Sequence, residues 1–183
     1  MESKLNYYKL FGLAEVAQMM QIDRVRKEIL RSFKRVPPQR DWRSQEDPED
    51  YELGPLFRKS WYELAKLDHS YDIYASNILI LPPVDMAYYL PAFMLRSLSR
   101  DENDGDIEEN LLDLLCDEGT YGNEVRSLVQ PESRKAITYF ILYETERGLR
   151  ILSHHSHDPM VVQMVLNETR RNLRGIELWN LQS

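Results

Sequence analysis

The densest group of side chains that could bind a metal ion is the stretch HHSHD. It holds three imidazoles and one carboxylate, which are suitable ligands for zinc or nickel: His154, His155, His157 and Asp158. Adjacent histidines in a loop point in different directions, and His69 is the only other histidine of the chain. A metal site is therefore the weaker hypothesis. We predict no cofactor here and favour a solvated interhelical loop in which Asp158 caps the next helix.

An acidic stretch follows the centre of the chain and resembles a calcium loop in composition only. Nine acidic residues and no Lys or Arg lie between Asp101 and Glu118. With Gly105 at the invariant glycine position of an EF-hand loop, Arg100 and Leu111 would occupy two positions that need oxygen ligands. The spacing excludes that loop and favours a solvated face, or a surface that binds a basic partner.

The single cysteine, Cys116, is a poor candidate nucleophile. Asp117 and Glu118 follow it directly, and neighbouring negative charge raises the pKa of a thiol. The chain also has no G-x-S-x-G, P-loop or dinucleotide-binding glycine motif. We predict no catalytic residue, and the sequence leans against an enzyme.

Residues 22–35 form an amphipathic helix with a basic outer face. The apolar stripe contains Ile22, Val25, Ile29, Leu30 and Phe33, and the sequence VPP ends the helix. The outer face carries Arg24, Arg26, Lys27, Arg31, Lys34 and Arg35. Nucleic-acid binding through this face is a minority hypothesis, because the chain has a net charge of -7. Pairing with acids of the same chain and simple solvation remain alternatives.

The remaining elements are also predicted to be helical. A charged loop spans 37–54, Pro55 opens a helix that carries Leu56 and Trp61, and the apolar residues 78–81 form an extended segment. After the acidic stretch, GTYGN is predicted to be a turn. Pro131 then opens a helix that Gly148 closes, and the last helix runs from Asp158 to Gly175.

The segment 82–99 is predicted to be the central buried helix. It is apolar on most of its circumference, which is typical of a helix surrounded by other elements. Pro91 removes a backbone hydrogen bond in its middle, so neighbouring helices must hold the segment, and a kink would let it curve around the core. The predicted fold class is an all-α, compact irregular bundle of about six to seven helices around this Pro-kinked helix.

Length and composition predict one helical domain over 1–183, with 1–20 as an N-terminal arm and 148–183 as a C-terminal loop plus helix. A chain of 183 residues is long enough for one core, and its one cysteine excludes an internal disulfide. The first residues do not match a secretory signal pattern, and no apolar run is long enough to cross a bilayer. We therefore expect a cytoplasmic protein with no membrane partner.

Four stretches together resemble a bacterial family of small uncharacterised proteins, classed as a domain of unknown function. They read RVRKEILRSFKRVPP, FRKSWYEL, ILPPVDMAYYLPAFMLRSL and VQPESRKAITYFILYETE, and YYLPAF is the most specific part. The resemblance covers roughly 22 to 147 and excludes both ends of the chain. It implies an intact helical domain in which Pro91 is a feature of the fold, and it transfers no catalytic residue.

The leading functional hypothesis is a protein-binding or regulatory module, such as an immunity-type protein. Its contact residues would come from the two charged segments: Arg24, Arg31, Arg35, Asp104, Glu108 and Glu109. The rival is a small-ligand protein or an enzyme with a pocket at the Pro91 kink, lined by Trp61, Asp85, Tyr88, Tyr89 and Arg96. The partner's identity stays open, and so does homo-oligomerisation.

Overall fold

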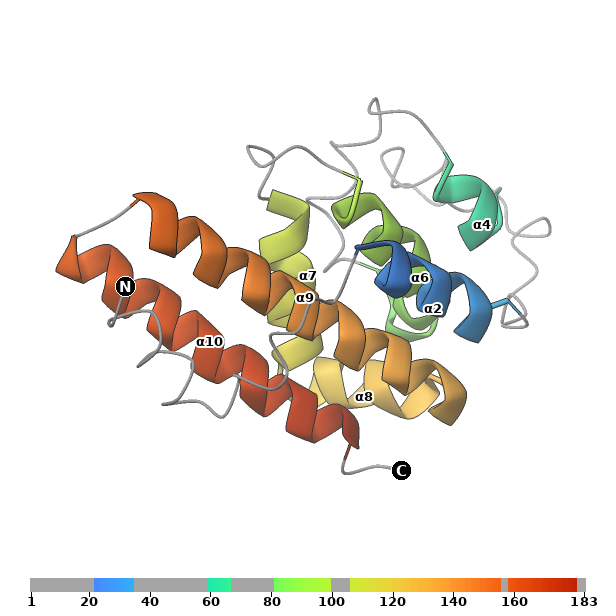
Figure 1. Ribbon diagram of the computed structural model, residues 1–183. Helices are drawn as coiled ribbons and strands as arrows, with labels where there is room; N and C mark the ends of the chain where they lie inside the picture. Colours follow the sequence, from blue (N-terminus) through green and yellow to red (C-terminus); the bar gives the residue numbers. More distant parts are fainter. Residues whose placement is uncertain (1–21, 35–58, 67–80, 100–105, 156–157, 181–183) are drawn as a thin grey trace.

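The computed structural model describes residues 22–34, 59–66, 81–99, 106–155 and 158–180. Within these ranges the chain contains seven helices and no strand, which confirms the all-α prediction (Figure 1). The helices are α2 (Ile22–Ser32), α4 (Trp61–Leu64), α6 (Pro83–Ser97), α7 (Asp106–Cys116), α8 (Thr120–Leu128), α9 (Pro131–His155) and α10 (Pro159–Asn180). The predicted arm 1–20, the loop 37–54 and residues 78–80 lie outside the described residues.

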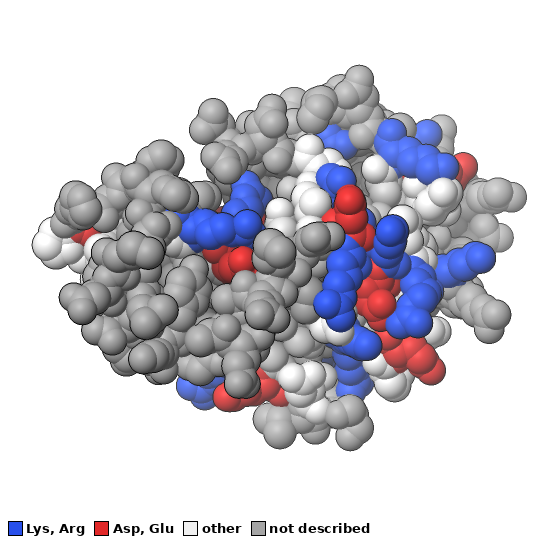
Figure 2. Space-filling view, viewed as in Figure 1, with Lys and Arg blue, Asp and Glu red and all other residues white. Residues whose placement is uncertain are grey.

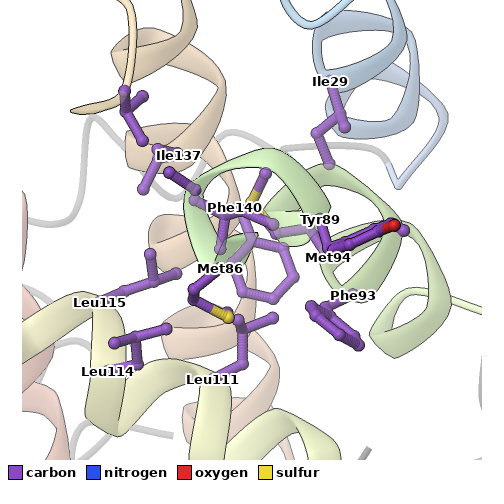
Figure 3. Packing of buried hydrophobic residues seen from close by; sticks show 14 of the residues in the cluster. Ile29, Met86, Tyr89, Phe93, Met94, Leu111, Leu114, Leu115, Ile137 and Phe140 are labelled. Atoms are coloured by element: carbon purple, nitrogen blue, oxygen red, sulfur yellow. The ribbon is translucent and has the colours of Figure 1, made fainter. Parts of the chain in front are cut away.

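Helix α6 is the central element, as predicted. It packs against α2, α4, α7 and α8, and every residue from Asp85 to Met94 is buried. Figure 3 shows its side chains meeting those of the surrounding helices. The labelled residues are Ile29, Met86, Tyr89, Phe93, Met94, Leu111, Leu114, Leu115, Ile137 and Phe140. A helix that is covered on all sides can be apolar all round, since no face meets water.

Pro91 lies inside α6, and the helix continues through it to Ser97. Pro82 is the N-cap and Pro83 lies in the first turn, where a missing N–H has no helical partner to lose. Pro91 itself is buried. Packing on all sides of the helix is therefore the compensation for the hydrogen bond that Pro91 cannot make.

Helices α9 and α10 form the longest pair, and both exceed their predicted length. The sequence predicts that Gly148 closes α9, but the helix continues to His155. It also predicts that Gly175 ends α10, but that helix continues to Asn180. Both glycines therefore lie inside helices, and α9 and α10 pack along each other.

The sequence GTYGN is not a turn but the first part of α8. The Asp117 carboxylate accepts hydrogen bonds from the N–H of Gly119 (2.8 Å) and of Gly122 (2.9 Å). It thereby satisfies donors that a helix start leaves unpaired. The glycines suggest a turn, whereas the preceding aspartate determines the helix.

Two other helix starts are capped by side chains. Asp158 accepts a hydrogen bond from the N–H of Met160 at 2.8 Å, which confirms its predicted role as the N-cap of α10. Ser60 and Glu63 form a capping box at α4, a pattern that is readable in the sequence but that our prediction missed. Ser60 is extended and α4 begins at Trp61, whereas Pro55 and Leu56, where the sequence predicts that this helix opens, lie outside the described residues.

Candidate functional site

Four of the five predicted pocket residues come together where α4 meets the first half of α6. The rings of Tyr88 and Tyr89 lie 4.8 Å apart, and the Tyr88 hydroxyl lies beside the backbone of Trp61. Asp85, buried one turn earlier, lies close enough to Tyr89 to raise its pKa. Arg96 does not join them, since it lies two helical turns beyond Tyr88, about 12 Å along the axis.

Two tyrosine hydroxyls of this region donate hydrogen bonds to backbone carbonyls. Tyr89 donates to the carbonyl of Lys59 (3.1 Å), and Tyr121 of α8 donates to that of Leu81 (2.7 Å). Burial, with a smaller effect from Asp85, raises the pKa of Tyr121 to about 12. These phenols stay protonated and fix chain segments that flank α4 and α6, which indicates a structural role.

Three acids in or just after α7 form ion pairs with arginines of α9 and α10. Glu108 forms an ion pair with Arg147 at 2.8 Å. Asp113 and Glu118 form ion pairs with two arginines near the C-terminus of α10, Arg171 and Arg174. Of the predicted contact residues, Glu109 is exposed, and Asp104 and Arg35 lie outside the described residues. Much of the α7 charge is therefore internal to the fold.

One carboxyl group that our sequence analysis missed lies at the centre of this network. The side chain of Glu144 is fully buried in α9, 3.2 Å from Arg147 and 3.4 Å from the hydroxyl of Ser97 on α6. Burial, together with the Glu108 carboxylate, raises the pKa of Glu144 to about 8. A signal was present in the sequence, because Glu144 falls on the apolar stripe that contains Ile137 and Ile141.

Cys116 is a buried residue that packs between helices. It is buried at the end of α7, and its thiol donates to the side-chain carbonyl of Asn172 on α10 at 3.7 Å. Burial raises the pKa of Cys116 to about 11, so the thiol is protonated at neutral pH. A Cβ atom at Gly175 would collide with Cys116 Sγ, so this glycine permits the close approach of α7 and α10.

The prediction for HHSHD is corrected in part. His154 and His155 belong to the last turn of α9 instead of a loop, while His157 lies outside the described residues. Among the side chains that the structure describes, no group of three or more His, Cys, Asp or Glu residues is arranged to hold a metal ion. The orientation of the three histidine side chains stays a prediction.

The strongest surface feature lies on α2 and the start of α9. Figure 2 shows Lys and Arg side chains gathered over these two helices, with a few acids between them. We define the basic face as the exposed cations of this region: Arg24, Lys27, Arg31, Lys34 and Lys135. Leu30 of the predicted apolar stripe is 38% exposed beside them, and α2 ends at Ser32.

The geometry of α2 and α9 makes the basic face continuous across both helices. The hydroxyl of Ser133 donates to the carbonyl of Ser32 at 3.1 Å, which joins the end of α2 to the start of α9. Arg24 and Lys135 each lie 5.4 Å from the centre of the Tyr139 ring. The ring therefore connects a cation of α2 with a cation of α9.

Few of these cations are neutralised by the protein itself. Within the part of the chain that the structure describes, Arg31 is the one member of the basic face in an ion pair, with Glu28 at 2.6 Å. Arg26, which the sequence also placed on the outer face, turns inward and donates to the carbonyl of Leu98 at 2.7 Å. The basic face is thus an exposed cationic surface on an acidic protein.

The comparisons with known proteins add no relative. No protein-family model matches the chain, and no curated protein or solved structure is similar enough to count as a match. The resemblance to the bacterial family with a YYLPAF helix therefore stays a prediction. None of the described helices is long and apolar enough to cross a membrane.

Proposed function

We propose that this chain is a protein-binding module that binds an acidic surface of another protein through the basic face. One observation carries the proposal, namely the different fates of the two charged segments. The α7 carboxylates Glu108 and Asp113, and Glu118 just after α7, form ion pairs with arginines of the same chain. The lysines of the basic face have no such partner among the described residues, so their charge is available to a second molecule.

The composition of the face favours a protein over a nucleic acid. Asp23, Glu28 and Glu132 lie among its five cations, and these acids would repel a phosphate backbone. The Tyr139 ring already lies between two cations of its own chain, so it is not free to stack on a base. The basic face contains both signs of charge with an excess of cations. It is therefore complementary to a protein surface that contains both signs with an excess of carboxylates.

A role of the immunity or regulatory type, in which the chain masks its partner in the cytoplasm, belongs to the same proposal. We also propose that the chain belongs to the bacterial family that its residues 22 to 147 resemble. Steering by opposite charge raises association rates and fixes orientation, as a masking protein requires.

The test is a pair of charge-matched variants used as bait in cytoplasm from bacteria, the source that the family resemblance suggests. Lys27→Glu/Lys34→Glu reverses two exposed cations of the basic face, and Lys66→Glu/Arg170→Glu reverses two exposed cations elsewhere. Both change the net charge by the same amount. We expect a stoichiometric acidic protein, identified by mass spectrometry, to be retained by the wild type and the control, and lost from the basic-face variant.

Two further measurements, with salt and with a labelled oligonucleotide, test whether the interaction is electrostatic and whether the partner is a protein. The complex should dissociate as salt rises, because exposed ion pairs are screened over about 10 Å at 0.1 M. Equal retention by both variants would remove the basic face from the interaction. Tight binding of a labelled oligonucleotide at low salt, lost in Lys27→Glu/Lys34→Glu alone, would replace the protein partner with nucleic acid.

A further inference from the structure

The two halves of helix α7 make polar contacts with different neighbours. The second half is bound to α10, because Asp113 forms an ion pair with that helix and the indole of Trp179 donates to the carbonyl of Leu115 at 2.9 Å. The first half contacts α9 instead, through the ion pair of Glu108 with Arg147 at 2.8 Å. The contact with α9 therefore holds the first half, while the contacts with α10 hold the second.

The contact between the first half of α7 and α9 contains two carboxyl groups and one cation. Arg147 lies 2.8 Å from Glu108 and 3.2 Å from Glu144, and the other oxygen of Glu144 lies 3.4 Å from the hydroxyl of Ser97 on α6. The Glu144 side chain is fully buried, so an unbalanced negative charge at this place is costly. One proton on the two carboxyl groups makes the cluster neutral. Glu108 is also a hydrogen-bond partner of Glu144, and a hydrogen bond between two carboxyl groups needs that proton.

The charges that act on Glu144 itself are those of Glu108 and Arg147. Burial and the Glu108 carboxylate raise the pKa of Glu144 to about 8, against the opposing effect of Arg147. Charged groups on the surrounding helices act on its neighbours Tyr143 and Glu168. They are Arg26 of α2, Glu109 and Asp113 of α7, Arg150 of α9 and Arg171 of α10.

The two carboxyl groups differ in their access to water. The Glu108 side chain is 24% exposed, whereas Glu144 is enclosed and lies one turn from Arg147 on the same helix. When the proton leaves, Arg147 stays beside Glu144, because α9 fixes their spacing. Glu108 is then the group that moves into water, together with the start of α7. Ile107 is buried next to it, so this movement exposes apolar surface.

We propose that Glu108 and Glu144 share one proton that closes the first two turns of α7 on α9, and that loss of this proton opens those turns to solvent. The closed form binds the proton more tightly than the open form, because opening hydrates both carboxyl groups. Opening therefore becomes more favourable as the pH rises from about 4.5 toward 8. A local charge change then biases an element with two arrangements, as in other proton-controlled switches. This switch is separate from the basic face, which lies on α2 and the start of α9.

Amide hydrogen exchange of the full-length chain, resolved by residue, tests the proposal. The informative amides are those of residues 110–112, because their hydrogen bonds lie within the first two turns of α7. From about pH 6 to about pH 8, their exchange in the wild type should increase at least about tenfold relative to Glu144→Gln at the same pH. Comparison at equal pH removes the effect of pH on the exchange chemistry. At about pH 8 these amides should also exchange at least about tenfold faster than the most protected amides of the second half of α10, which report on unfolding of the whole chain.

Two further variants identify the groups that share the proton. Glu108→Gln should remove the pH effect as Glu144→Gln does, because either change leaves one carboxylate for Arg147. Glu146→Gln is the matched control, since Glu146 forms a surface pair elsewhere on α9, and this variant should keep the effect. An exchange ratio of wild type to Glu144→Gln that is equal at both pH values would overturn the proposal. Exchange at 110–112 that is no faster than in α10 would also overturn it, by showing that the chain unfolds as a whole and α7 does not open locally.

Discussion

Helices α2 and α7 are both eleven residues long and both carry one dominant charge, yet the fold uses that charge differently. Two acids of α7, Glu108 and Asp113, form ion pairs with arginines of α9 and α10, and so does Glu118 just after the helix. Arg24, Lys27 and Arg31 of α2 are exposed, and Arg24 lies against Tyr139 of α9, which also contacts Lys135. Acids of α7 are thus paired with arginines of neighbouring helices, whereas most of the α2 cations are exposed to solvent.

This difference shows that a run of charge in a sequence does not identify an interaction surface. The neighbouring helices decide whether the charge is satisfied within the chain. Here Glu108, Asp113 and Glu118, from the described part of the most acidic segment, form ion pairs within the chain, and the more mixed segment α2 supplies the candidate docking surface. The following predictions test that contrast, from the largest expected effect to the smallest.

Removing the arginine at the centre of the α7 network should have the largest effect. Arg147→Ala leaves the buried Glu144 and the neighbouring Glu108 without their shared cation, and we expect a loss of about 3 kcal/mol in the free energy of unfolding. Arg150→Ala is the matched control, because Arg150 is half exposed and pairs with Glu146 on the surface. Its cost should stay below about 1 kcal/mol. Urea denaturation measures both, and equal losses would show that the α7 network is no more than surface pairing.

The same cluster should make stability fall with increasing pH. Because the pKa of Glu144 is raised to about 8, the folded state holds a proton that the unfolded state releases near pH 4.5. Stability from this group is fully present below pH 4.5 and is lost as pH rises toward 8. Glu144→Gln keeps the shape without the titration, so the variant should gain stability relative to the wild type as pH rises through that range.

The pH measurement has internal controls. Glu108, Arg147, Tyr143, Glu168 and the hydroxyl of Ser97 surround or influence the site, and all remain in the variant. The difference between wild type and Glu144→Gln therefore isolates one carboxyl group. If the difference in free energy of unfolding between wild type and Glu144→Gln is the same at every pH, the pKa of Glu144 is not raised.

Two glycine substitutions should have opposite signs. Gly175→Ala introduces a Cβ against Cys116 and should destabilise the packing of α10 on α7 by about 1 to 2 kcal/mol. Gly148→Ala meets no neighbouring atom in the middle of α9 and should stabilise the chain by about 0.5 to 1 kcal/mol, because alanine favours a helix interior. Thermal unfolding of the two variants would compare them directly. A stabilising Gly175→Ala would show that the contact of α7 with α10 is looser than the structure describes.

Neutralising one charge on each helix should give the smallest and most direct comparison. Asp113→Asn removes one half of a partly exposed ion pair with Arg171, so we expect a loss of about 0.2 to 1 kcal/mol that salt reduces. Lys27→Gln removes an exposed cation that has no described ion-pair partner, and the change should stay within about 0.5 kcal/mol. A larger loss for Lys27→Gln would mean that the basic face stabilises the fold and is not held free for a partner.

For the predicted pocket at α4 and α6, the sequence identified most of the residues but not the contacts that they make. Trp61, Asp85, Tyr88 and Tyr89 do come together, because they belong to α6 and to the helix that packs on it. The carbonyl of Lys59, which accepts from Tyr89, and that of Leu81, which accepts from Tyr121, could not be predicted, since residues from separate elements have no fixed spacing in sequence. Tyr139, which joins the basic face across two helices, was missed for the same reason.

Local patterns determined the helical class, the buried helix α6 and the capping of α10 by Asp158. Each follows from interactions within a few residues of the chain, such as apolar periodicity or a side chain next to an unpaired N–H. The tertiary structure alone decided that Gly148 and Gly175 remain inside helices and that Glu144 is buried as a proton-binding carboxyl. It also decided that Glu108 and Asp113 of α7 pair with arginines of other helices, while Arg24 and Lys27 of α2 have no ion-pair partner among the described residues. Those outcomes depend on which helix lies opposite, and the sequence carries that information only through the packing of the complete chain.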